Sequence, residues 1–389
     1  MNVRRSAAVL AATVVIGTAA PAVAASPSPT LPSGLYGSTD PTYDGVWRQS
    51  LALIAQHRLD VEPAAAAVDW LTGQQCASGA FAAYRAAPAK ACDAKLMVDT
   101  NSTAVAVQAL SAVGGHDTET GKAVAWLKSV QNKDGGWGYA PGGASDANST
   151  SVVVGALNAV GDDPSEVLKS GKSPYDALLK LSLPCADGGA FAYQPDKKGE
   201  FTANADATAA AVVGALGEGM GSARAGDGSS AACADAASPT PEQAASNGAA
   251  YLAKAVAKDG YLKSVLPGSE DQPDYGNTAD AVVALAVQGG PEATRKPLAW
   301  LERNSAKWAA QSGPAAYAQL ILAADVAGAD PHDFGGTDLV KLLNATGPAP
   351  SAKSEDDSGS SVWWTVGAGL AAGAGIGFLL SARNKRKRS

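Results

Sequence analysis

WLKSVQNKDGGWGYAPGGASDANSTSVVVGALNAVG, residues 126–161, contains two apolar helical segments joined by a polar, glycine-rich loop. The first segment ends near Gln131, and Asp134-Gly135-Gly136-Trp137 breaks the helical pattern. Asn148-Ser149-Thr150 opens the second segment, because short polar side chains accept hydrogen bonds from the free N–H groups of a first helical turn. Gly161 ends it, since glycine readily follows a helix in the left-handed conformation. The stretch therefore predicts a helical hairpin with an aromatic residue packed between its helices.

The same pattern occurs three more times along the chain. Thr103, Thr150 and Thr278 each stand seven residues before the leucine of an Ala-Leu pair, and Thr208 stands eight before. A repeated unit of this length must bury its apolar face against its neighbours. The other three breaks are Gly79-Ala80-Phe81, Asp187-Gly188-Gly189-Ala190-Phe191 and Asp259-Gly260-Tyr261.

Incomplete copies of the helical hairpin stand at both ends of the repeated region. Residues 43–54 have the place of a second helix whose partner is missing. Residues 297–308 and 337–344 look like first helices, and 315–327 like a second helix. Six helices of each kind predict an all-α fold, an (α/α)6 toroid that closes when its terminal helices pair. The second helices are rich in Ala, Val and Leu, which suits the buried inner ring, whereas the first helices carry charges that suit the outside.

The repeats resemble the prenyltransferase/squalene-oxidase repeats of the α/α-toroid superfamily. Gln131-x4-Gly136-Trp137 is close to the QW-type motif, and Phe81, Phe191 and Tyr261 replace the tryptophan in the other copies. The resemblance covers residues 36–344. The superfamily includes terpenoid cyclases, protein prenyltransferase β subunits, cobalamin carriers of the intrinsic factor and transcobalamin kind, and complement thioester domains. It implies the fold and leaves the activity open.

The start of the chain has the features of an exported protein. The chain has 389 residues, 46% of them hydrophobic, and a formal charge of −7, which argues against a nucleic acid as partner. Residues 1–25 resemble a secretory signal peptide, with Arg4-Arg5, an apolar core and the cleavage pattern Ala22-Val23-Ala24. We expect residues 26–346 to form the extracytoplasmic toroid domain.

The end of the chain has the pattern of a membrane anchor. Residues 347–361, rich in Pro, Ser and acidic side chains, are expected to form a disordered linker. Residues 362–380 lack charges and approach the ~20 residues needed to cross a bilayer. The basic tail, 381–389, would be cytoplasmic by the positive-inside rule. The expected localisation is the cell membrane, with a single transmembrane helix and the toroid outside.

Four cysteines agree with export. An even number in a secreted chain suggests disulfides, and three pairings are possible. We favour Cys76–Cys92 with Cys185–Cys233, because these bonds would tie down long loops at equivalent places of two copies. A zinc site is the alternative, but the spacings are not C-x-x-C and the chain has only three histidines.

The catalytic patterns of the superfamily are not found in the sequence. There is no Asp-x-Asp-Asp run and no Cys-Gly-Glu-Gln run, and no cysteine stands on an expected inner helix. Asp162-Asp163-Pro164-Ser165-Glu166 superficially matches an Asp-Asp-x-x-Asp/Glu magnesium motif, but it follows Gly161 and is better explained as a cap and acidic first turn of a helix. We therefore assign no catalytic residue and no metal ligand. An enzymatic function is less favoured than a binding function.

The expected function is a membrane-anchored capture protein for a bulky amphipathic ligand, with a membrane transporter as a potential partner. The run from Asp99 to Ala106 resembles the helix starts of the cobalamin carriers, which makes a corrinoid one candidate ligand and implies no other cofactor. A terpenoid or polyprene cyclase-like enzyme and a structural or protein-interaction module are the alternatives. Polar residues at the inner-helix starts and nearby aromatic residues are the candidate ligand contacts, with N-capping as the competing explanation for the polar ones. They are Asp44, Trp47, Asp99, Asn101, Ser102, Asn148, Asp206, Asp274, Tyr275, Asn277 and Tyr317.

Overall fold

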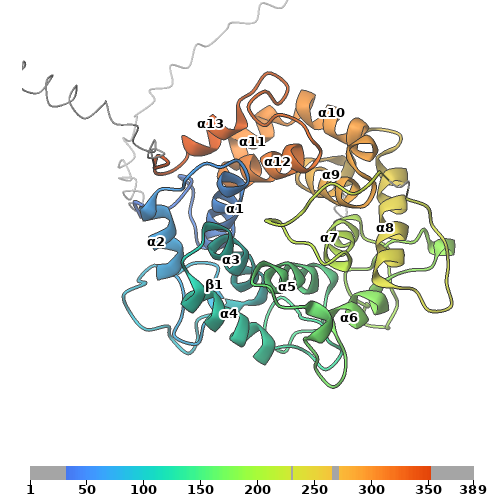
Figure 1. Cartoon of the computed structure of the whole chain (residues 1–389), viewed down its shortest axis with the longest axis horizontal. Coiled ribbons are helices and arrows are strands. Elements are labelled where there is room, and N and C mark those ends of the chain that lie inside the picture. The colour runs from blue at the N-terminus through green and yellow to red at the C-terminus, as the bar shows by residue number, and fades with distance from the viewer. Residues whose placement is uncertain (1–31, 229–230, 265–270, 352–389) are drawn as a thin grey trace, which may run out of the picture. The chain divides into compact units, whose positions relative to one another are not determined.

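Six apolar helices surround a common centre, as Figure 1 shows. The structure, a computed structural model, describes residues 32–228, 231–264 and 271–351, which belong to one unit beginning at Pro32. Each inner helix contacts the next, and the last contacts the first, so the ring closes. In ring order they are α1 (Gly45–Arg58), α3 (Thr100–Val113), α5 (Ala147–Ala159), α7 (Ala205–Ala215), α9 (Tyr275–Gly289) and α12 (Pro314–Val326).

The outer helices pack against this inner ring, and the expected helical toroid is confirmed in the described residues. The fifth outer element was expected as one helix over 297–308, but it is two helices that meet at Ser305. The outer helices are α2 (Ala65–Gly73), α4 (Asp117–Ser129), α6 (Pro174–Leu181), α8 (Pro241–Val256), α10 (Arg295–Asn304) with α11 (Ala306–Ser312), and α13 (Leu339–Asn344). Short 3-10 turns lie at η1 (Pro164–Glu166), η2 (Cys185–Asp187) and η3 (Pro291–Thr294).

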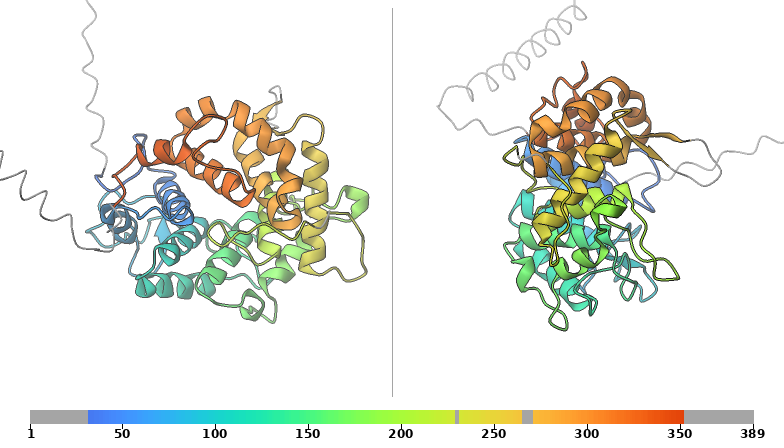
Figure 2. Two further views of the ribbon diagram at one scale, coloured as in Figure 1. Left: turned by 45° about the horizontal axis from the view of Figure 1, so that its top comes forward. Right: turned by 90° about the vertical axis from the view of Figure 1, so that its right-hand side faces the viewer.

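Two short antiparallel strand pairs lead into inner helices. β1 (Phe81–Ala82) pairs with β2 (Val98–Asp99), which ends where α3 begins. β3 (Leu262–Ser264) pairs with β4 (Gln272–Asp274), which ends where α9 begins. The β3–β4 pair projects from the body of the ring (Figure 2).

Side-chain caps fix where four inner helices start. Asp99, Asp146, Asn204 and Asp274 each accept a hydrogen bond from the backbone N–H three residues later, at 2.6, 2.7, 2.8 and 3.0 Å. The expectation that Asn148-Ser149 caps α5 is therefore wrong by two residues, because Asp146 is the last extended residue before the helix.

The predicted end of α5 has the geometry of a C-terminal cap. Gly161 has a φ of +79°, where a side chain would be strained. Its N–H donates to the carbonyl of Asn158, and the N–H of Asp162 donates to that of Leu157. This pair of bonds is the Schellman arrangement.

A buried threonine joins each repeat to its own inner helix. The Oγ1 atoms of Thr103, Thr150, Thr208 and Thr278 accept the backbone N–H of Phe81, Trp137, Phe191 and Leu262, at 2.9, 3.1, 2.9 and 2.9 Å. All four threonines are fully buried. The eight-residue spacing of Thr208 therefore does not change its role.

Phe81, Trp137 and Phe191 are buried between the helices, as predicted, and the Trp137 indole N–H donates to the carbonyl of Leu127 at 2.8 Å. We call the residue packed between the helices of a repeat its plug. In the fourth repeat the plug is Leu262, so the expectation that Tyr261 is the plug is wrong. In all four repeats the plug stands two residues after a glycine of positive φ, which here is Gly260.

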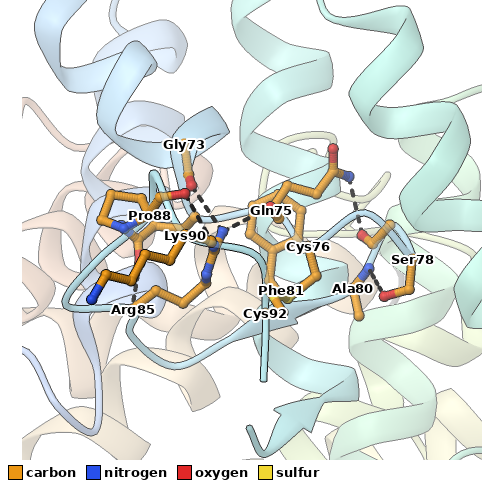
Figure 3. Close-up of a disulfide and its surroundings, with 12 residues drawn as sticks. Gly73, Gln75, Cys76, Ser78, Ala80, Phe81, Arg85, Pro88, Lys90 and Cys92 are labelled. Atoms are coloured by element: carbon orange, nitrogen blue, oxygen red, sulfur yellow. Dashed lines mark hydrogen bonds between the residues drawn. A yellow bond between two sulfur atoms is a disulfide. The ribbon is translucent and has the colours of Figure 1, made fainter. Parts of the chain in front are cut away.

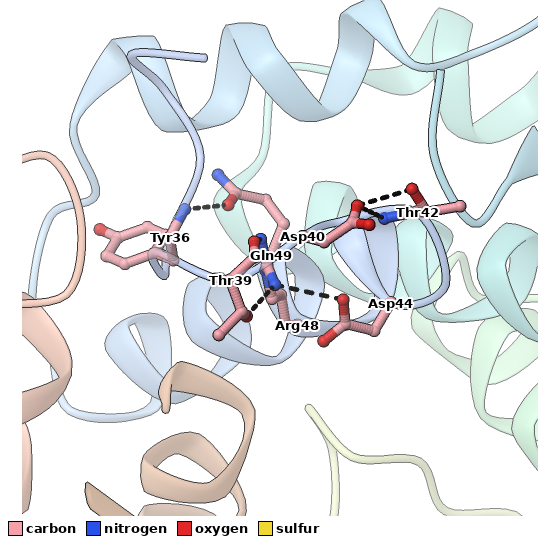
Figure 4. Close-up of polar contacts among 7 residues, drawn as sticks. All are labelled: Tyr36, Thr39, Asp40, Thr42, Asp44, Arg48 and Gln49. Atoms are coloured by element: carbon pink, nitrogen blue, oxygen red, sulfur yellow. Dashed lines mark hydrogen bonds and ion pairs between the residues drawn. The ribbon is translucent and has the colours of Figure 1, made fainter. Parts of the chain in front are cut away.

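The ring closes where the two ends of the described chain meet. The Gln49 amide accepts the Tyr36 N–H at 2.9 Å, and the buried Arg48 donates to Thr39 and pairs with Asp44 (Figure 4). Gln56 donates to Asn344 at 2.7 Å, which links α1 to α13. The predicted pairing of the terminal helices is therefore confirmed.

Both favoured disulfides are present. Cys76 bonds Cys92, and Cys185 bonds Cys233. The first lies beside Arg85, whose guanidinium donates to four backbone carbonyls, those of Gly73, Gln75, Pro88 and Lys90 (Figure 3). This loop is therefore held by a covalent bond and a buried cation together.

Several expectations fall outside the described residues. The signal peptide (1–25), the transmembrane helix (362–380) and the basic tail (381–389) lie there, as does most of the linker (347–361). Within the described ranges, none of the helices has the length and apolarity to cross a membrane. Ser351 lies against the ring, with its N–H donating to the carbonyl of Glu62 at 3.0 Å.

The threonine hydrogen bond yields the first testable prediction. Thr150→Val keeps the shape of the side chain but leaves the buried Trp137 N–H without its acceptor, so we expect a loss of about 1–3 kcal/mol in the free energy of unfolding. Thr118→Val, on the exposed face of α4, should change it by no more than about 0.5 kcal/mol. Urea unfolding measures both, and equal stability of the two variants would contradict the role of this bond.

Candidate functional site

A cavity of about 270 Å³ lies at the centre of the ring. All six inner helices line it. Hydrogen bonds between equivalent first turns, such as Asn148 to Asp206, and between equivalent last turns, such as Ser111 to Ala159, show that neighbouring inner helices run in the same direction. Polar residues of the helix starts are therefore gathered at one end of the cavity.

Three of the expected residues occupy the same position in successive repeats. Asn101, Asn148 and Asp206 each follow their cap residue by two, and all three line the cavity. The Asn148 amide donates to the Asp206 carboxylate at 2.7 Å. The side-chain oxygens of Asn101 and Asn148 are buried and have no hydrogen-bond partner. This wall therefore contains two buried acceptors without a partner in the protein.

Asp280 and Gln319 add a second polar pair that the sequence analysis missed. Each follows its own cap residue by six, on α9 and α12, and both line the cavity. Gln319 donates to Asp280 at 2.7 Å and to the carbonyl of Gly276 at 3.3 Å. The available signal was a lone acidic residue in the apolar run Thr278-Ala279-Asp280-Ala281-Val282.

Burial and mutual repulsion make these carboxyls weak acids. Burial raises the pKa of Asp280 to about 7; the Gln319 hydrogen bond opposes this shift, and the charges of Asp206 and Asp274 add to it. Burial also raises the pKa of Asp206, against the hydrogen bond from Asn148 and together with the charge of Asp274. Near neutral pH, Asp280 is therefore poised between its neutral and charged forms.

Residues 217–226, here called the floor segment, close the other end of the ring. Glu218, Gly219, Met220 and Ala223 line the cavity, and the segment crosses the centre of the ring in Figure 1. Gln108 accepts the Met220 N–H at 2.8 Å. The guanidinium of Arg58 bridges the Ala223 carbonyl, at 2.8 Å, and the carboxylate of Asp325.

The other expected contact residues lie away from the cavity lining. Asp99 and Asp274 are caps, and Ser102 and Asn277 donate their N–H groups to them. Asp44 pairs with Arg48 at 3.2 Å. Tyr317 is buried, which raises the pKa of its hydroxyl.

The remaining expected residues are both aromatic. Tyr275 packs between the rings of Trp300 and Trp308, with centroids 5.0 and 5.5 Å apart. Trp47, from α1, does line the cavity, beside Asn101, Asn148 and Asp206.

No metal centre is formed by the described residues. All four cysteines are in disulfides, and no group of three or more His, Cys, Asp or Glu side chains there could hold a metal ion. Asp162 pairs with Lys128 at 2.8 Å, and Asp163 caps η1, so the apparent magnesium motif acts as a cap on the outside.

The fold is shared with known structures at low sequence identity. No protein-family model matches the chain, and the search of curated proteins found no match to its sequence. A protein from Actinoplanes is 16% identical, over 76% of this chain and 92% of that chain, with a TM-score of 0.49. An ent-copalyl diphosphate synthase from Streptomyces platensis is 15% identical, over 73% of this chain and half of that chain, with a TM-score of 0.50. A sugar epimerase from a ruminal bacterium is 13% identical, over 77% and 93%, with a TM-score of 0.51. At these identities the last two likenesses establish the α/α-toroid fold alone.

Two Asn→Ala variants separate a cap from a cavity residue. Asn204→Ala removes the acceptor for the Ala207 N–H and should lower the free energy of unfolding by about 1 kcal/mol. Asn101→Ala removes an oxygen that has no partner, so we expect less than about half of that loss. Chemical denaturation measures both; a larger loss for Asn101→Ala would show that Asn101 supports the fold.

Asp280 should make stability depend on pH. Its pKa is about 7 in the folded protein and near 3.8 when unfolded, so between these values the unfolded chain loses its proton while the folded chain keeps it. Stability from this group should therefore fall as pH rises from about 4 to about 7, by up to roughly 4 kcal/mol, and then level off. Asp280→Asn should lack this fall, whereas Asp117→Asn, on the exposed start of α4, should retain it. Unfolding curves at pH 4 to 8 measure the effect, and parallel curves for wild type and Asp280→Asn would contradict it.

Proposed function

We propose that the ring binds one small amphipathic ligand in its central cavity. The supporting observation is the cavity itself, with polar acceptors at the helix starts, an apolar middle and a closed floor. Its volume, about 270 Å³, is slightly below the roughly 300–1,000 Å³ that is usual for small-molecule sites. The apolar middle is formed by Leu51, Val213, Met220, Val283, Leu322 and Val326.

The volume favours a ligand smaller than a corrinoid. A corrinoid would have to lie across the inner-helix starts, with only a peripheral group entering the cavity. A molecule with one apolar ring or short chain and a polar head matches the lining better, because the apolar part would reach the floor segment while the head met Asn101, Asn148 and Asp280.

We place this activity outside the cell, at the membrane. The two disulfides support an oxidising compartment, in agreement with the signal sequence read in residues 1–25. The uncharged stretch 362–380 and the basic tail after it supply the proposed anchor. A protein held there would concentrate its ligand at the membrane and could pass it to a transporter.

Asp280 supports acid–base catalysis as a second candidate function. A carboxyl with a pKa of about 7 can both donate and accept a proton at neutral pH. Such a carboxyl is a weak acid, which is unsuited to protonating an isolated alkene as protonating terpenoid cyclases do. Proton exchange at a more acidic carbon or oxygen would suit it better. Incubation of the protein with a squalene-type polyprene tests the cyclase alternative directly.

The binding proposal can be tested with N-phenyl-1-naphthylamine, an uncharged fluorescent probe. Its fluorescence should rise when it enters the cavity of the wild-type chain. Ala210→Trp fills the cavity from α7 and should weaken binding at least tenfold. Ala255→Trp makes the same change on the exposed face of α8 and should leave binding unchanged. Equal binding by both variants, each with wild-type stability, would place the probe elsewhere and reject the cavity as the site.

A further inference from the structure

We propose that the ligand carries a protonated amine, which binds between Asp206 and Asp280 while its apolar part fills the cavity. This inference rests on the proposed binding function and names the chemical class of the ligand. It follows from the charge and the hydrogen-bonding character of the lining, taken together with its shape.

The ionisable side chains of the lining are all acidic. Asp206, Asp280 and Glu218 line the cavity, and among the described residues no lysine, arginine or histidine does. Asp274, at the start of α9, repels both Asp206 and Asp280. Gln319 and Asn148 hydrogen-bond these two carboxyls but carry no charge. An anionic head would meet several like charges there, whereas a cation would relieve their repulsion.

Unused acceptors point to a head rich in N–H donors. Ser151 is 5% exposed, its hydroxyl has no partner, and it lines the cavity on α5. The free oxygens of Asn101 and Asn148 belong to the same lining. A primary ammonium has three donors and no acceptor, so it can satisfy two carboxylates and one of these oxygens at once. Trp47 adds an aromatic ring, which can attract a cation.

Other classes of ligand fit less well. A metal ion is disfavoured because no cluster in the described residues has metal-binding geometry. A sugar would use the acceptors but would leave its hydroxyl groups against Leu51, Val283 and Leu322. An amphipathic amine uses both parts of the lining.

The test compares three probes of nearly equal size: 2-phenylethylammonium, 2-phenylethanol and phenylacetate. Isothermal titration of the full chain at pH 8 should show the ammonium binding at least tenfold more tightly than the alcohol, and phenylacetate binding most weakly. At pH 6 the ammonium must displace the Asp280 proton, so its affinity should fall by several-fold. Titrations in two buffers of different ionisation enthalpy should then detect the release of a proton. The affinity for 2-phenylethanol should not rise with pH.

Variants assign the effect to the carboxyls. Asp280→Asn should abolish the proton release and reduce the preference for ammonium over alcohol at least tenfold, and Asp206→Asn should reduce the preference as well. Asp117→Asn, exposed on α4, is the matched control and should behave as wild type.

The outcomes separate this inference from the proposed function. If the alcohol binds as tightly as the ammonium, or phenylacetate binds more tightly, the ammonium inference is overturned and the binding function stands. If the ammonium fails to bind, the inference is again overturned, and N-phenyl-1-naphthylamine then decides whether the cavity binds ligands at all. Ammonium binding without proton release at pH 6 would also overturn it.

Discussion

The hydrogen bond from a plug residue to a buried threonine fixes the geometry of the ring. In four repeats the threonine Oγ1 accepts the N–H of the residue packed between the helices, and in three of them it also donates to the carbonyl of the cap residue. The bond therefore ties the loop, the cap and the first turn of the inner helix together. Because these groups are buried, losing one partner leaves the other unsatisfied, which is costly. The bond thus fixes where α3, α5, α7 and α9 begin and how each is rotated about its axis.

The candidate site follows from this constraint. Residues two positions after the cap line the cavity in α3, α5 and α7, and residues six positions after it do so in α5, α7, α9 and α12. The first set contains Asn101, Asn148 and Asp206, and Gly276 in α9 leaves space that Gln319 enters. The floor segment then closes one end through Arg58 and Gln108, neither of which belongs to the repeat pattern. The repeats thus position the inner helices, whereas the polar groups and the floor segment come from residues that differ between repeats.

The sequence was sufficient for features that depend on local pattern. Repeats, plugs and the two disulfides could be predicted because each is set by neighbours within one hairpin. Two of the errors were errors of register: α5 is capped by Asp146, and Leu262 replaces Tyr261. In all four repeats the residue packed between the helices stands two positions after a glycine of positive φ, so counting two residues from Gly260 would have identified Leu262. Part of the cavity wall was predicted, because Asn101, Asn148 and Asp206 lie at helix starts. Asp280, Gln319 and the floor segment were not, because their places depend on which residues of separate helices face one centre.

The position of Asp280, six residues after the helix cap, is apolar in three other inner helices: Val105 in α3, Val152 in α5 and Ala210 in α7. In α1 the equivalent residue is Ser50. An apolar side chain therefore satisfies the packing at this position in three helices of the ring. A carboxyl at this place is held in a desolvated position near two like charges, and its raised pKa means that its ionisation destabilises the folded state. A group that costs stability, replaces an apolar residue and faces a cavity is better explained by contact with a ligand than by structure. The same argument applies to Gln319, which occupies this position in α12 and keeps Asp280 oriented. Asp280 and Gln319 are therefore the positions of the cavity lining at which the proposed ligand contact, rather than packing, accounts best for the residue type.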